Sequence, residues 1–384
     1  MKRVIHRELW RIRKSPRHVV LLTLGITVTF LFFATNMREG QPENLPVAVV
    51  DMDGSYLSRR ICHEIDATQG VHVVAVYSNH TEARKAMQRG EIFAFYEIPQ
   101  GTYNRVLQFQ APHFGLYSNP AYLLAGTLSY KQLATMGMLA AGAVQREVLR
   151  KKGYDEEQTM GLIMPVEFDT HLVGNPMANY QVYLMTTLIP AVIAFVVLLH
   201  TIYLIGREWE ERTVRSLMLK AGGDPLKALA GKMLPYSVHY ILLLLLANLI
   251  MFGPMHFPLE GSWLAMVLAS VLLVLAAQSA GVFIGGCLGD PPFAMGVGAV
   301  YSALCFSLSG FSFPVEAMPR VFNGISWLYP IRHYYKIYSD AAIFGGGPEH
   351  CWPHICALVA FGLLALVGMY MFGHRYRQYE RSLA

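Results

Sequence analysis

Six long stretches that contain no charged residue constrain this chain more than any other feature of its sequence. They cover residues 19–35, 181–206, 233–259, 261–289, 291–315 and 351–374. Crossing the hydrocarbon core of a bilayer takes about 20 mostly apolar residues, with roughly 17 as the lower limit, so all six qualify as spans. Only 15% of the residues are charged, against roughly a quarter in soluble domains, which disfavours a soluble enzyme. We therefore expect an α-helical polytopic membrane protein with six transmembrane helices.

The distribution of Lys and Arg predicts the side of the membrane on which each segment lies, because cytoplasmic loops retain positive charge. Residues 1–18 hold seven basic residues and a single acid, Glu8. With six crossings, the inner segments hold 16 basic and 7 acidic residues, and the outer segments hold 15 and 19. We expect a multi-pass protein of the inner (cytoplasmic) membrane with both termini in the cytoplasm. The net charge of +5 follows from this topology and does not indicate a nucleic-acid partner.

Residues 36–180 form the one large polar segment and have the pattern of an α/β domain inserted between the first two spans, on the outer side. The expected elements are strands at 45–50, 71–77, 92–98 and 114–118, helices at 55–66 and 81–88, and a long helix that ends near Lys152. Such alternation is typical of a layered domain. No glycine fingerprint follows the first strand, so a nucleotide site is not indicated. Residues 1–35 precede this domain and residues 181–384 follow it.

The segment 207–223 follows the second span directly and lies on the predicted inner side. Glu208 with Arg212 and Glu211 with Arg215 are four residues apart, which places each opposite-charge pair on one face of a helix. Exposed pairs of this kind contribute only about 0.2–0.5 kcal/mol each, so Gln at both Glu positions should barely affect folding. Two interpretations stay open: an amphipathic helix at the lipid interface, and a helix that docks into a cytoplasmic partner.

Two further segments have a distinctive pattern. Gly281, Gly285 and Gly289 are spaced four apart, which permits a close helix contact either within one chain or across a dimer. Residues 311–338 are apolar but interrupted by prolines, which predicts short helices that dip into the outer leaflet. The aromatic side chains expected at the level of the lipid headgroups are those of Trp327, Tyr329, Tyr334 and Tyr335.

The sequence contains no local signature of catalysis, and we predict no catalytic residue. It has no G-x-x-x-x-G-K-S/T motif, so the chain does not hydrolyse nucleotide by a P-loop. The ionisable residues well inside the spans are His200 and His239. We expect each to be packed or hydrogen-bonded rather than to relay protons.

Residues with metal-ligand side chains gather once, at Glu349, His350, Cys351 and His354. Because no further distant ligand is identifiable, we predict no metal site. Cys62 and Cys351 would both face the outside, and a disulfide between them is an alternative that the sequence alone leaves open.

These parts, in this order, resemble the ABC-2 membrane family, the permease subunits of type V ABC exporters. The most specific stretches are LPVAVVDMDGSYLSRRI (45–61), REWEERTVRSLMLKAGG (207–223) and SGFSFPVEAMPRVFNGISWLYPIRHYYKI (309–337). The likeness covers nearly the whole chain. Two departures stand out: Arg212 precedes Thr213 where members often have Gly, and Ala221 with Gly222 stand where members often have Pro.

The resemblance implies roles for two segments. The segment 207–223 corresponds to a coupling helix that contacts the ATPase subunit, here Glu208, Trp209, Glu210, Glu211, Arg212, Thr213, Arg215 and Leu217. The segment 314–338 corresponds to outer half-helices that close the external side, with the residues Phe313, Pro314, Pro319, Trp327, Pro330 and Tyr334. ATP and Mg would be bound by the partner ATPase, and this chain itself would hold no cofactor.

The expected function is that of the transmembrane permease subunit of an ATP-driven exporter. Its expected partners are an ABC ATPase, a second permease copy in a homodimer or related heterodimer, membrane lipid and a periplasmic adaptor (membrane fusion protein). The cargo is expected to be amphipathic, such as a drug, a lipid or a lipid-linked molecule, because the spans have apolar walls without a charged site. The alternative is a receptor or scaffold whose external domain binds a ligand or adaptor. A self-powered carrier is disfavoured because the spans lack acids.

Overall fold

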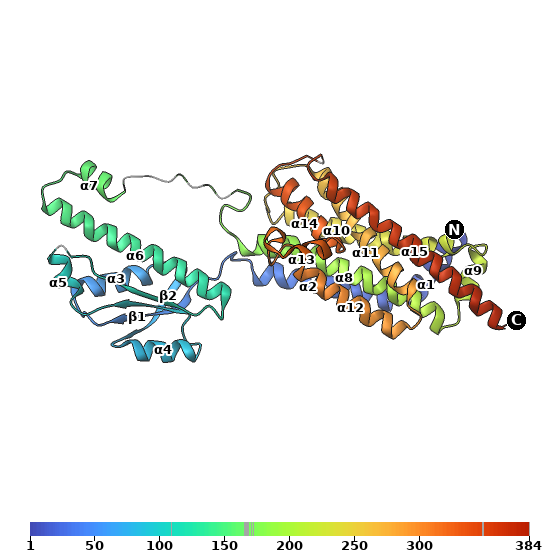
Figure 1. Cartoon of the computed structure of the whole chain (residues 1–384), viewed down its shortest axis with the longest axis horizontal. Helices are drawn as coiled ribbons and strands as arrows, with labels where there is room; N and C mark the ends of the chain where they lie inside the picture. Colours follow the sequence, from blue (N-terminus) through green and yellow to red (C-terminus); the bar gives the residue numbers. More distant parts are fainter. Residues whose placement is uncertain (109, 165–168, 170, 172, 348, 384) are drawn as a thin grey trace. The chain divides into compact units, whose positions relative to one another are not determined.

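Two units make up the chain in the computed structural model (Figure 1), one comprising Met1–Gly40 with His171–Ala384 and the other Gln41–Thr170. The structure describes all residues except 109, 165–168, 170, 172, 348 and 384. The first unit is helical, and the second contains a sheet.

The described residues of the second unit form a four-stranded sheet in the spatial order β2-β1-β3-β4. The strands are β1 (Leu45–Asp51), β2 (Val71–Tyr77), β3 (Ala94–Ile98) and β4 (Gly115–Ser118). β1 pairs parallel with β2 and β3, and β4 pairs antiparallel with β3. All four strands lie at or within one or two residues of the ranges expected from the sequence.

Helices cover both faces of this sheet, so the unit has three layers (Figure 1). Val47 and Val49 of β1 pack in one core with α3 (Tyr56–Asp66) and α6 (Leu123–Lys151). Ala48 and Val50, which point the other way, pack with α4 (His80–Gln88). Two short helices, α5 (Thr102–Leu107) and α7 (Glu156–Ile163), were not expected from the sequence.

Among the described residues, five helices are long and apolar enough to cross a membrane. They are α2 (Arg17–Asn36), α8 (Tyr180–Glu210), α10 (Pro225–Phe252), α11 (Trp263–Cys287) and α15 (Trp352–Leu383). The remaining expected span contains α12 (Pro291–Ser307), whose 17 residues extend only about 26 Å at 1.5 Å per residue, less than a hydrocarbon core of about 30 Å. The count of six spans therefore stays a prediction.

α11 lies at the centre of the helical unit and packs against α8 and α15. A Cβ on Gly281 would lie 2.8 Å from the carbonyl oxygen of Leu198 on α8, so this glycine allows close contact of the two backbones. A Cβ on Gly285 would lie 3.2 Å from Ile205 of the same helix. In this structure both glycines therefore pack within one chain.

Two further glycines, Gly286 on α11 and Gly289 just after it, face α15. A Cβ on Gly289 would lie 3.5 Å from the Arg375 side chain. The Arg375 guanidinium donates a hydrogen bond of 2.9 Å to the Gly289 carbonyl oxygen. Gly286 and Gly368 form a second crossing that the sequence pattern did not single out. A Cβ on Gly286 would meet the Gly368 carbonyl at 2.2 Å, so only glycine fits.

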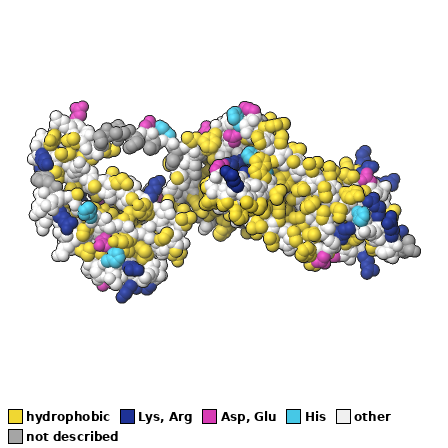
Figure 2. All heavy atoms as spheres, viewed as in Figure 1, with side chains coloured by type: hydrophobic (Ala, Val, Ile, Leu, Met, Phe, Trp, Pro, Cys, Tyr) yellow, Lys and Arg dark blue, Asp and Glu magenta, His cyan; other side chains and the backbone are white. Residues whose placement is uncertain are grey.

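A band of hydrophobic side chains covers the helical unit, and Lys and Arg gather at the end that carries both termini (Figure 2). This end also contains α1 (Lys2–Lys14), a helix that the sequence reasoning did not predict. Hydrophobic surface of this extent is typical of a protein that lies in lipid.

The proline-rich segment after α12 forms short helices: η1 (Val315–Ala317), α13 (Arg320–Ser326) and α14 (Pro330–Tyr338), followed by the π-helical turn η2 (Ser339–Ile343). Trp327 is 43% exposed, whereas Tyr329 and Tyr334 are buried. Tyr334 lies on α14, which packs against α11 and α15, and Tyr329 directly precedes that helix. The expected level of these tyrosines at the lipid headgroups stays a prediction.

Candidate functional site

The segment 207–223 is not the single helix that the charge spacing predicts. α8 ends at Glu210, and Arg212 has a backbone φ of 55°, in the left-handed region where a right-handed helix does not continue. A short helix, α9 (Val214–Lys220), begins after this turn. The expected pairs cross the turn, so their members do not share one helical face.

Glu208 is fully buried, where the spacing predicts an exposed side chain. Its carboxylate accepts hydrogen bonds from Arg7 at 2.7 and 3.0 Å, from Arg11 at 2.5 Å and from Lys232 at 2.7 Å. The Thr213 hydroxyl donates a further bond of 2.7 Å and thereby holds the turn against the end of α8. A buried carboxylate needs such partners, because an uncompensated charge in the interior is strongly destabilising.

A second buried carboxylate joins these cations. Glu8 accepts hydrogen bonds from Arg7 at 2.8 Å and from Lys232 at 3.3 Å. We call Arg7, Glu8, Arg11, Glu208 and Lys232 the ion cluster; it ties α1 to the end of α8 and the start of α10. Burial lowers the pKa of Arg7, but the hydrogen bond and charge of Glu208 outweigh burial and raise this pKa above its ordinary value. Arg7 therefore stays charged.

The other residues of the predicted coupling helix are divided between the interior and the surface. Glu211 pairs with Arg207 at 2.5 Å and with Arg11, rather than with Arg215. Trp209 packs edge-on against Phe372 and Tyr379 of α15. Leu217 is fully buried, whereas the charged residues that stay exposed are Glu210, Glu211, Arg212 and Arg215.

Sequence reasoning missed several residues of this site. Leu219 on α9 is 69% exposed beside those charges and offers an apolar contact. The signal for α1 was the spacing of Val4, Glu8 and Arg11, which repeats every three to four residues and marks one helical face. Lys232 lies directly before an apolar run, where the sequence pattern indicates only a charge at the end of a span.

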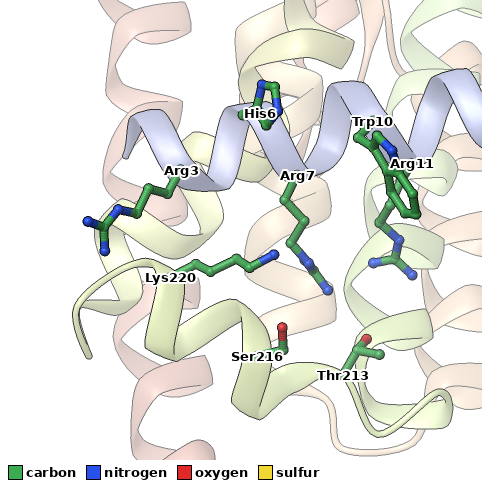
Figure 3. A pocket seen from close by; sticks show the side chains of 8 residues that line it. All are labelled: Arg3, His6, Arg7, Trp10, Arg11, Thr213, Ser216 and Lys220. Atoms are coloured by element: carbon green, nitrogen blue, oxygen red, sulfur yellow. The ribbon is translucent and has the colours of Figure 1, made fainter.

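Two cavities of the helical unit bear on function. One, of about 330 Å³, lies between α1 and α9 (Figure 3). The other, which we call the apolar groove, has a volume of about 380 Å³. Its walls come from α8, α11, α12 and α14, with Leu188, Phe195, Leu198, Tyr301, Phe306 and Pro330 among the lining residues.

The predicted outer residues do not converge on one place in the structure. Pro330 lines the apolar groove, and Tyr334 is buried in the helical core. Phe313 is 51% exposed. Pro314 directly precedes η1, and Pro319 directly precedes α13.

Several histidines of the helical unit lie within hydrogen-bond distance of another side chain. His200 Nδ1 lies 2.8 Å from the Tyr240 hydroxyl, and His239 Nε2 lies 2.9 Å from the Thr23 hydroxyl. His354 lies against His333, Nδ1 to Nδ1 at 3.0 Å. In the described part of the chain, no group of three His, Cys, Asp or Glu side chains is arranged to hold a metal ion. Both cysteines of the open disulfide alternative, Cys62 and Cys351, are free in this structure.

The fold and sequence match one family over most of the chain. Residues 19–370 match the model for the ABC-2 family transporter protein, so the chain belongs to the ABC-2 family. Membership identifies it as a membrane transport subunit and agrees with the apolar helices of the first unit.

Its relatives in Escherichia coli K12 are ABC permeases at low identity. The "Inner membrane transport permease YhhJ" is 23% identical over 358 residues, 93% of this chain and 92% of the relative. The "Probable multidrug ABC transporter permease YbhR" is 22% identical over 364 residues, 93% of each chain. The similarly titled YbhS is 24% identical over 216 residues, so the chain matches 56% of that relative's length.

Proposed function

We propose that this chain is the permease subunit of an ATP-driven exporter and that a separate ABC ATPase energises it. Family membership and the absence of a P-loop motif from the sequence support this assignment. ATP and Mg would be bound by the ATPase, and the permease would move its cargo outward. Both termini and α9 would lie in the cytoplasm, and the α/β unit outside.

The observation that carries the proposal is the ion cluster. It joins α1, α8 and α10 through buried charges, so these helices cannot shift separately without breaking hydrogen bonds to Glu208. A displacement of α9 by the ATPase would therefore move the ends of three helices as one body. The exposed residues Glu210, Arg212, Arg215 and Leu219 offer the contact surface for the ATPase.

The apolar groove supports an amphipathic cargo. Its lining is aliphatic and aromatic, and the hydroxyls of Tyr301 and Ser302 are its polar side-chain groups. A drug, a lipid or a lipid-linked molecule fits this chemistry. The word "multidrug" in the titles of YbhS and YbhR agrees with this class of cargo.

The complete transporter would contain two permease copies, identical or related, and two ATPase subunits. The α/β unit would bind a periplasmic adaptor, and the short helices of 314–338 would close the outer end of the pathway. These assignments rest on the likeness to the family and on the distribution of Lys and Arg.

The test is purification of the chain from its native membrane, identification of any ABC ATPase that stays bound, and measurement of ATP hydrolysis by the complex. Glu210→Arg with Arg215→Glu reverses one exposed charge at the end of α8 and one on α9, and should reduce both ATPase recovery and cargo-stimulated hydrolysis. The matched control is Arg60→Glu with Glu64→Arg, which reverses an exposed pair on α3 and should change neither. Wild-type recovery and stimulation in the first variant would contradict the proposed contact. Substantial hydrolysis by the purified permease alone would overturn the subunit assignment.

A further inference from the structure

The cavity between α1 and α9, which we call the basic cavity, is rich in positive charge. Its lining residues are Arg3, His6, Arg7, Trp10, Arg11, Thr213, Ser216 and Lys220. In Figure 3 the side chains of Arg7 and Lys220 extend into the space between the two helices, the Ser216 hydroxyl faces this space from α9, and Thr213 lies directly before α9. None of these described lining residues is acidic.

Two of the cations in the basic cavity are not neutralised within the chain. Arg7 and Arg11 are bound by the carboxylates of the ion cluster. Arg3 and Lys220 are exposed and form no ion pair with any other residue that the structure describes. The basic cavity therefore has a positive excess that an anion would balance, and Ser216 can donate a hydrogen bond to it.

The position of α1 indicates the source of the anion. Only Ser15 and Pro16 separate α1 from α2, which begins the first apolar span. Leu9 and Trp10 are 52% and 56% exposed, and the Lys14 ammonium lies 5.0 Å from the centroid of the Trp10 ring. Exposed aromatic and aliphatic side chains among cations are typical of a helix at the membrane interface, where lipid headgroups lie.

We propose that the basic cavity binds the phosphate of an anionic phospholipid. Arg3 and Lys220 supply the charge from α1 and α9, and Ser216 donates a hydrogen bond to a phosphate oxygen. The lipid thereby connects the two helices beside Arg7, which also binds the buried Glu208. Lipid binding at this site requires a membrane but no ATPase. The lipid proposal can therefore be refuted without refuting the proposed transport function.

The test uses the purified full-length chain in nanodiscs of phosphatidylglycerol and phosphatidylcholine, with bound lipid measured by native mass spectrometry. Arg3→Ala with Lys220→Ala should weaken phosphatidylglycerol retention at least roughly tenfold and leave phosphatidylcholine unchanged. The matched control, Lys2→Ala with Arg13→Ala, removes the same charge from exposed positions of α1 outside the basic cavity and should retain the lipid. The charge-preserving exchange Arg3→Lys with Lys220→Arg should also retain it.

Three results would overturn the proposal. Equal weakening in both Ala double variants would show diffuse attraction to the surface rather than a site. Displacement of phosphatidylglycerol by an equal concentration of inorganic phosphate would identify a free anion as the ligand. If Arg3→Ala with Lys220→Ala abolished co-purification of an ATPase but left lipid retention unchanged, the basic cavity would be a protein-docking surface.

Discussion

Arg7 and Glu208 form a two-point hydrogen bond, at 2.7 and 3.0 Å, although 201 residues separate them in the sequence. Both side chains are buried, so the pair is shielded from solvent and salt. The first helix of the chain is thereby attached to the turn that precedes α9. An N-terminal segment that holds seven of the 16 basic residues on the predicted inner side thus also belongs to the candidate coupling site.

Glu208→Gln should destabilise the protein strongly, by about 3–5 kcal/mol, because it leaves buried cations without their shared carboxylate. This reverses the expectation from sequence that Gln at this position is harmless. Glu211→Gln, at a partly exposed carboxylate, is the control and should cost at most about 1 kcal/mol. Thermal unfolding in one detergent compares the variants. Equal midpoints would show that the ion cluster does not stabilise the fold.

Gly281→Ala should destabilise the contact between α8 and α11 by about 1–3 kcal/mol, because the added methyl group would lie 2.8 Å from the Leu198 carbonyl oxygen. Gly296→Ala on α12 is the control, since a Cβ there meets no described atom within 4 Å. Unfolding midpoints and the dimer fraction should be measured together. Normal stability with loss of dimer would place Gly281 at an interface between chains instead.

Single cysteines in a cysteine-free background test the orientation. Cysteines at Arg60 and Met160 of the α/β unit should react with an impermeant thiol reagent in intact cells, and one at Arg215 should react only after lysis. All three positions are exposed in the structure, so the chain itself shields none of them from the reagent. Labelling of position 215 in intact cells would refute the cytoplasmic placement of α9.

Lowering the pH should destabilise residues 320–338, which contain α13, α14 and His333. Burial lowers the pKa of His333 to about 4, while its Nε2 lies 3.0 Å from the Trp327 carbonyl oxygen. The folded state therefore binds fewer protons than the unfolded state between about pH 6.5 and 4, and stability falls as pH drops through this window. Hydrogen exchange of residues 320–338 at pH 7 and pH 5 measures the effect.

His333→Gln removes the titrating group and should make that exchange less dependent on pH. His354 and Arg332 are the titratable and charged neighbours of His333, and both stay in place in this variant. An unchanged pH dependence would assign the effect to another group.

Local patterns predicted much of the architecture. The alternation of Val47, Ala48, Val49 and Val50 belongs to a strand buried on both faces, and the first strand, its helix and the second strand lie where the sequence placed them. Apolar runs likewise marked the long helices of the first unit. These features depend on neighbours in the sequence, which is why one sequence was enough.

The coupling segment could not be predicted in the same way, because its partners are distant. The spacing of Glu208 and Arg212 suggested a local pair, but Arg7 and Lys232 occupy the carboxylate of Glu208. Arg212 adopts a left-handed conformation that few non-glycine residues take, and the adjoining Thr213 is held by Glu208. Tertiary contacts thus outweighed the helical propensity of the segment.

The ion cluster also dictates an order of assembly. During synthesis α1 emerges first, yet its buried partners Glu208 and Lys232 are translated some two hundred residues later. Arg7 and Glu8 must therefore stay hydrated until the ends of α8 and α10 have been made. Docking of α1 against the ends of α8 and α10 is therefore a late event in biogenesis. A chain truncated before Lys232 would leave α1 undocked at the membrane surface.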